Sequence, residues 1–112
     1  MLNRLQEITG NDDEMYRAMS RLLFLDPKRI TMTLEDAAAQ ASSFEASGNK
    51  TRAEVWYRIA GGICLYKGDV DGVRKFFEKA ASIVGDSRPE YKTVASRASD
   101  AVALARKYYE NL

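Results

Sequence analysis

Histidine is absent from this sequence of 112 residues, and cysteine occurs only once. The missing histidine removes the commonest general base and the commonest metal ligand of proteins. A single cysteine can form neither an internal disulfide bond nor a zinc site. From these absences we expect a protein that is not an enzyme and that uses no metal or other cofactor.

The chain also has little net charge, since 17 Lys and Arg residues are opposed by 16 Asp and Glu residues. A domain dedicated to nucleic-acid binding is usually strongly basic. The basic excess is confined to residues 57–112, which hold 10 basic and 7 acidic side chains. A nucleic-acid-associated regulator that uses this half is therefore the alternative function. Our main expectation is that the chain has no nucleic-acid partner.

Long apolar runs are missing as well. No window approaches the ~18 apolar residues of a membrane span, and the first residues lack the apolar stretch of a secretory signal. A lone cysteine also fits a reducing compartment better than an oxidising one. We expect a protein of the cytoplasm that has no membrane partner.

What the chain does contain is helical periodicity, because apolar residues recur at intervals of three and four. In residues 69–84 this stripe consists of Val70, Val73, Phe77, Ala80 and Val84. Residues 89–109 carry a similar stripe, and residues 50–66 carry two, which predicts a central helix with neighbours on two sides. We predict an all-α domain over residues 1–112, built of antiparallel helical hairpins, with four long helices and a short N-terminal helix at 2–8.

Residues that start and end helices occur at matching places. Thr33 with Asp36, and Ser87 with Glu90, have the spacing of a capping box, in which two residues satisfy each other's free backbone amides. The left-handed conformation that often ends a helix suits glycine, and the glycines at suitable places are Gly48, Gly68 and Gly85.

The middle of the predicted helix 50–66 is built from small residues. Gly61 and Gly62 each cost up to about 1 kcal/mol relative to alanine inside a helix. We expect close approach of a neighbouring helix as the compensation, with a local kink as the alternative. Cys64 lies in the same stretch and has no histidine to activate it, so we expect a buried structural thiol.

A motif of the form Gly-[Asn/Asp]-x3-[Ala/Val]-x3-aromatic-x2-Ala begins at Gly48 and again at Gly68. This pattern resembles the tetratricopeptide repeat, a helix–turn–helix unit. The matches cover residues 34–67 and 54–87, and residues 22–27 resemble the closing segment of such a repeat. The resemblance implies a short solenoid of degenerate repeats over about residues 12–110, and a closed helical bundle is the alternative.

The same resemblance implies a non-enzymatic protein-interaction or adaptor module that binds a peptide or helix in a groove between helices. If residues 54–87 form one repeat, the resemblance places five residues near the concave face: Val55, Arg58, Gly62, Leu65 and Tyr66. We take Arg58, Leu65 and Tyr66 as the candidate partner-binding residues, with Arg58 anchoring a carboxylate and Tyr66 making an amphipathic contact. The alternatives are a core position for Tyr66 with a merely solvated Arg58, and a structural homo-oligomer.

Overall fold

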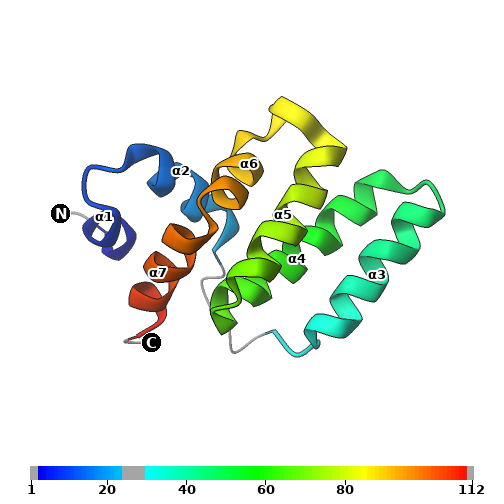
Figure 1. Ribbon diagram of the computed structural model, residues 1–112, viewed down its shortest axis with the longest axis horizontal. Coiled ribbons are helices and arrows are strands. Elements are labelled where there is room, and N and C mark those ends of the chain that lie inside the picture. The colour runs from blue at the N-terminus through cyan, green and yellow to red at the C-terminus, as the bar shows by residue number, and fades with distance from the viewer. Residues whose placement is uncertain (1–2, 24–29, 111–112) are drawn as a thin grey trace.

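The computed structural model describes residues 3–23 and 30–110, and this part of the chain is helical (Figure 1). The elements in chain order are α1 (Arg4–Thr9), α2 (Asp13–Leu22), α3 (Leu34–Ala46), α4 (Lys50–Lys67), α5 (Val70–Val84), a 3-10 turn η2 (Gly85–Ser87), α6 (Pro89–Ser96) and α7 (Ala98–Tyr109). The prediction of an all-α protein is confirmed. The predicted closing segment 22–27 lies largely outside the described residues.

Helix α4 occupies the middle of the molecule. It packs against α3 on one side and α5 on the other, and it also contacts α7. Helix α5 then packs against α6, so helices α3 to α6 contact one another in chain order (Figure 1). The central position predicted for residues 50–66 is therefore confirmed.

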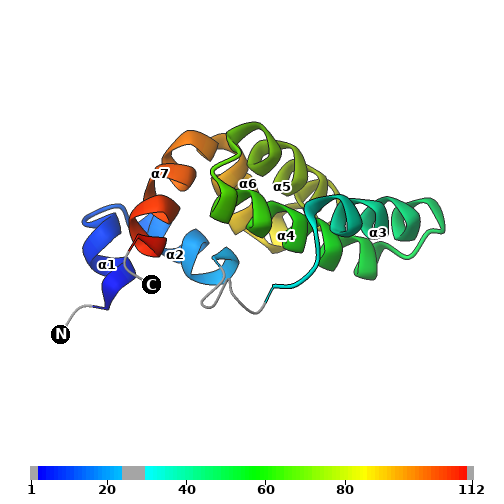
Figure 2. The same ribbon diagram turned by 90° about the horizontal axis from the view of Figure 1, so that it is seen from below.

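The two ends of the chain meet on the other side of the molecule. Helix α2 packs against α6, and α1 packs against both α2 and α7 (Figure 2). The Arg4 guanidinium donates hydrogen bonds to the carbonyl oxygens of Lys107 at 2.8 Å and Tyr108 at 3.1 Å. In an open row of repeats each unit contacts only its neighbours. These contacts between distant helices go beyond such a row, so the repeat-like arrangement stays a prediction.

The single helix expected at 89–109 is wrong, because the chain breaks at Arg97 between α6 and α7. Arg97 has φ −119° and ψ 40°, outside the helical region. Its guanidinium makes a two-pronged ion pair with Asp12, at 3.0 and 2.6 Å, and also bonds Asp100. Neither a glycine nor a proline marks this break, and the apolar stripe continues across it through Val94, Ala98 and Ala101. The sequence pattern therefore predicts one unbroken helix here.

The predicted helix starts hold in part. The Thr33 side chain accepts the backbone N–H of Asp36 and caps α3. The capping box predicted for Ser87 and Glu90 is wrong, because the Ser87 hydroxyl donates to the carbonyl oxygen of Val84 at 2.8 Å. Helix α6 begins without a side-chain cap, and Pro89, which needs no partner for a backbone N–H, occupies its first turn.

Gly61 allows α4 and α5 to approach closely, as predicted. A Cβ atom added there would lie 2.6 Å from the Cζ atom of Phe77. Phe77 is fully buried and its ring stacks on that of Tyr91 at 6.0 Å. The aromatic pair therefore fills the space that the absent side chain leaves, and this packing joins α4, α5 and α6. The predicted left-handed helix end is confirmed at Gly68, with φ 80° and ψ 25°. Gly48 and Gly85 also have positive φ angles, but the ψ of −138° at Gly85 lies outside the left-handed helical region.

Candidate functional site

The side of α4 that faces away from the core carries exposed apolar side chains. Val55 is 38% exposed and Tyr66 is 50% exposed, and these are the exposed large hydrophobic residues of the described chain. They are eleven residues apart, which is three helical turns with an offset of only about 20°. Both therefore point the same way, on a line that also passes the half-buried Ile59 and the buried Gly62. We call Val55, Arg58, Ile59 and Tyr66 the α4 face.

Two of the residues that were expected near this surface are buried instead. Leu65 is only 1% exposed, and Gly62 is also buried. Leu65 immediately precedes Tyr66 and so points about 100° away from it around the helix. That direction turns its side chain toward the packed interior. Arg58 is half-buried and Tyr66 is exposed.

A cleft of about 220 Å³ lies where the C-terminal end of α4 meets α7. Its lining consists of Leu65, Tyr66, Lys67, Gly68, Val102, Arg106, Tyr109 and Glu110. We call it the tyrosine cleft. Leu65 contributes to its wall although it is almost inaccessible, while Tyr66 stands at the exposed rim. The cleft thus combines an aromatic rim, an apolar wall and the charges of two basic residues and one acidic residue.

Tyrosine rings support this rim. The Tyr66 ring meets the Tyr109 ring edge to face at 5.0 Å, and Tyr109 meets Tyr108 in the same way at 5.4 Å. Arg4 of α1 lies over the Tyr108 ring at 5.9 Å. Such aromatic pairs contribute about 0.5–1.5 kcal/mol beyond the area they bury. The exposed Tyr66 ring is therefore held in place by contacts that extend to α1.

The surroundings of Arg58 are set by a buried carboxylate one turn earlier on α4. Glu54 accepts the Tyr91 hydroxyl at 2.7 Å and pairs with Arg88 at 3.2 Å. Burial, together with the Glu54 charge, raises the pKa of Tyr91 to about 12, and the nearby Arg58 charge opposes this rise. Glu54 is thus already bound, and Arg58 makes neither a hydrogen bond nor an ion pair within residues 3–23 and 30–110.

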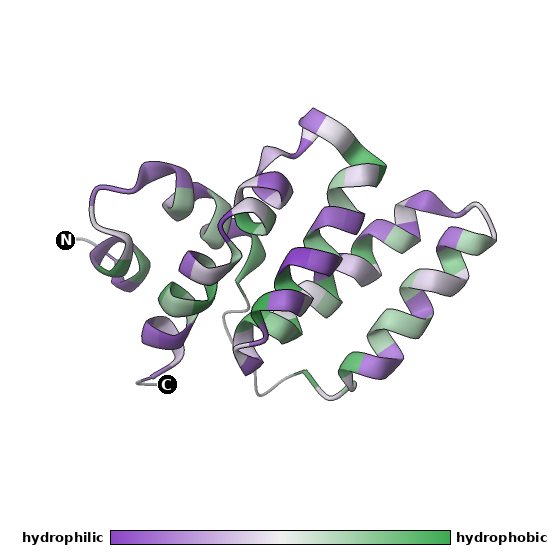
Figure 3. Cartoon of the chain, in the orientation of Figure 1, coloured by the Kyte–Doolittle hydropathy of each residue, from purple (hydrophilic) through white to green (hydrophobic). Residues whose placement is uncertain are grey.

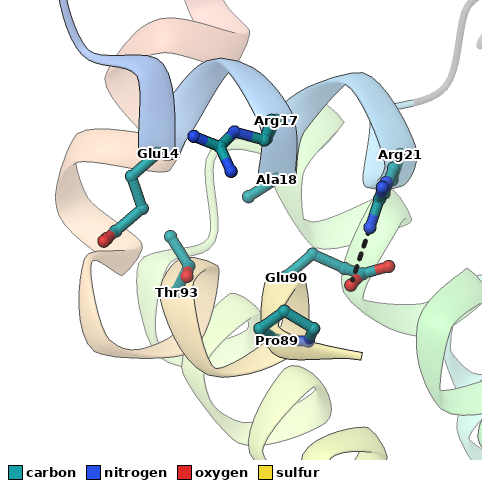
Figure 4. A pocket seen from close by; sticks show the side chains of 7 residues that line it. All are labelled: Glu14, Arg17, Ala18, Arg21, Pro89, Glu90 and Thr93. Carbon is teal, nitrogen blue, oxygen red and sulfur yellow. Dashed lines mark hydrogen bonds and ion pairs between the residues drawn. The ribbon is translucent and has the colours of Figure 1, made fainter. Parts of the chain in front are cut away.

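A second hollow, of about 330 Å³, lies between α2 and α6 (Figure 4). Its lining consists of Glu14, Arg17, Ala18, Arg21, Pro89, Glu90 and Thr93. Arg21 reaches across to Glu90 at 3.5 Å and so joins the two helices. Two arginines and two glutamates balance in charge, and Ala18 and Pro89 are the apolar residues of the lining.

The outward side of α5 provides a contrast with the α4 face. Its exposed residues are Asp71, Arg74, Lys75, Glu78, Lys79 and Ser82, and Figure 3 shows this side as largely hydrophilic. Arg74 pairs with Asp71 one turn away at 3.5 Å. Mixed charges without an exposed apolar side chain are typical of a solvated surface.

Cys64 does not provide a nucleophile. It is fully buried in α4, and its sulfur lies 3.9 Å from Asp69 Oδ2. Burial, assisted by the Asp69 charge, raises the pKa of the thiol to about 12. The reactive thiolate is therefore scarce near neutral pH, and the prediction of a buried thiol is confirmed.

The described residues contain neither a metal site nor a membrane helix. Histidine, cysteine, aspartate and glutamate nowhere gather in a group of three that could hold a metal ion within residues 3–23 and 30–110. In the same ranges no helix combines the length and the apolar character needed to cross a membrane.

Comparison with protein-family models, with curated proteins and with solved structures finds no match to this chain. The tetratricopeptide-like resemblance therefore stays a prediction.

Proposed function

We propose that this protein is a non-enzymatic interaction module that binds a peptide or helix of another protein along the α4 face. The observation that carries the proposal is the alignment of Val55 and Tyr66, the exposed large hydrophobics, on one side of one helix. Exposed apolar side chains gathered on one surface often mark interaction sites, whereas scattered ones are ordinary. Tyrosine and arginine are also the residue types most often found at the energetic centre of protein interfaces.

Each residue has a role in this proposal. Tyr66 supplies a large amphipathic contact at the rim of the tyrosine cleft, and Val55 extends the apolar line by three turns. Arg58 lies between them and offers a guanidinium that can bind a carboxylate through two hydrogen bonds. An adaptor of the cytoplasm with tetratricopeptide-like helices is consistent with this surface, and the buried Cys64 suits a reducing compartment.

A crosslinking experiment tests the site directly. A photoreactive phenylalanine analogue is introduced at position 66, and in a matched control at the exposed position 82 of α5. After illumination in lysate from the source organism, with nuclease added, we expect discrete protein adducts from position 66 and none from position 82. A self-adduct at position 66 would instead support the homo-oligomer.

Charge and side-chain variants complete the test. Charge reversal Arg58→Glu and truncation Tyr66→Ser are expected to remove the adducts formed from a reactive analogue at the neighbouring position 55. The matched charge reversal Arg74→Glu on α5 should leave them unchanged. Far-ultraviolet circular dichroism checks that each variant is folded. Equal adducts from all three variants would contradict the proposed site.

A further inference from the structure

The charges exposed along α4 are all of one sign. The helix carries four basic residues, Lys50, Arg52, Arg58 and Lys67, of which three are exposed and Arg58 is half-buried. Its only acidic residue is Glu54, which is buried and bound by Tyr91 and Arg88. Solvent therefore meets α4 as a positively charged helix that also exposes apolar side chains.

Three acidic residues close to α4 are engaged or lie away from the Val55 side. Glu45 of α3 is exposed and accepts the Tyr57 hydroxyl at 2.5 Å, and Tyr57 lies about 200° around α4 from Val55. Asp69 caps α5 by accepting the backbone N–H of Gly72. Glu110 lines the tyrosine cleft together with Lys67 and Arg106, so positive charge is in excess there as well.

The spacing of the contacts suits a helix better than an extended peptide. Val55 and Tyr66 lie about 16 Å apart along the axis of α4, with Ile59 between them. Side chains of a second helix repeat with the same period, so its ridges can follow this line. Helices that bind in this way contact their partner through apolar residues at intervals of three and four.

We propose that the partner of the α4 face is an acidic amphipathic helix. Its apolar stripe covers Val55, Ile59 and Tyr66, and one apolar side chain enters the tyrosine cleft. Its carboxylates flank the stripe and pair with Arg58 and Lys67. This inference rests on the proposed function and names the chemistry of the partner. Charge complementarity selects it, because Arg58 on this face and Lys67 at its end are both basic.

The experiment is a selection from a displayed library of random peptides about 16 residues long, enough to cover the face with a turn to spare. The library is selected against the wild-type protein and against a double variant, Arg58→Glu with Tyr66→Ser. A matched double variant on α5, Arg74→Glu with Ser82→Ala, serves as the control. Circular dichroism confirms that all three proteins are folded.

We expect the wild-type protein to enrich acidic peptides with apolar residues at intervals of three and four. Synthetic copies of these peptides should bind the Arg58→Glu, Tyr66→Ser variant at least about 10-fold more weakly, a loss of about 1.4 kcal/mol. The α5 control should bind them as the wild-type protein does. Binding should also weaken as salt is added, because the charges lie at the surface.

The two proposals can fail separately. If enriched peptides require Tyr66 but are neutral or basic, the acidic partner is wrong and the interaction site stands. If the wild-type protein enriches nothing beyond the double variant, the proposed function fails as well. Duplex DNA and phosphatidylserine vesicles are tested in parallel. Binding of either that Arg58→Glu abolishes would assign the face to another polyanion and overturn the inference.

Discussion

Replacing Gly61 with alanine tests the close approach of α4 and α5. The new Cβ atom would lie 2.6 to 2.8 Å from three ring atoms of Phe77. Carbon atoms normally stay about 3.5–4.0 Å apart, so the ring has to move by about 1 Å. Phe77 is fully buried and stacked on Tyr91, whose hydroxyl is bound by Glu54. The ring therefore has little room to move.

Two opposing effects decide the magnitude of the change. Alanine is favoured over glycine inside a helix by about 1 kcal/mol. Adding a methyl group to a well-packed core costs about 1–3 kcal/mol. Because Tyr91 blocks the retreat of Phe77, we take the upper half of that range for the packing cost. The free energy of unfolding should then fall by about 1–2 kcal/mol.

The assay is urea unfolding followed by circular dichroism, performed as a double-mutant cycle with Phe77→Leu. Leucine lacks the Cε and Cζ atoms that the new methyl group would meet. In that background Gly61→Ala should cost nothing or stabilise the protein by up to about 1 kcal/mol, which gives a coupling energy of about 1–3 kcal/mol. If Gly61→Ala stabilises the protein by about 1 kcal/mol in both backgrounds, the packing argument is refuted.

The remaining predictions concern the Asp12–Arg97 pair and Cys64. The hydrogen bond from Arg97 lowers the pKa of Asp12, so its contribution to stability is present above the unfolded pKa of about 3.9 and is lost as pH falls through the folded value. The urea midpoint of the wild-type protein should therefore fall more steeply below about pH 4 than that of Asp12→Asn, which keeps a capping side chain; parallel curves would contradict this. Because its thiol is buried with a pKa near 12, Cys64 should react with a thiol reagent only as urea unfolds the protein. Immediate reaction of the native protein would show that the thiol is accessible.

Local patterns predicted most of the helical segments. The period of apolar residues located α3, α4 and α5 to within a few residues, because a helix that packs on one side has to bury a stripe. Thr33 was identified as a cap since its hydroxyl satisfies an amide of its own helix. Gly61 was recognised as a point of close approach because glycine in mid-helix is costly without such a reason. These features depend on neighbours in the sequence.

The candidate site was predicted less completely. Tyr66 and Arg58 lie on an accessible side of α4, but Leu65 is buried against the interior near α7. The assignment of Leu65 depended on a repeat register that places α4 against fixed neighbours. Periodicity alone cannot decide which sides of a central helix with two apolar stripes stay open.

The amino-acid sequence by itself determined that the protein is all-α, that residues 50–66 form a central helix, and that no histidine-based or disulfide chemistry is available. Those conclusions follow from composition and from short-range periodicity. Only the tertiary structure decided the break at Arg97 and the meeting of α1 with α7. It also decided which side of α4 remains exposed. These features arise from contacts such as Arg97 with Asp12 and Arg4 with Tyr108, whose partners are far apart along the chain.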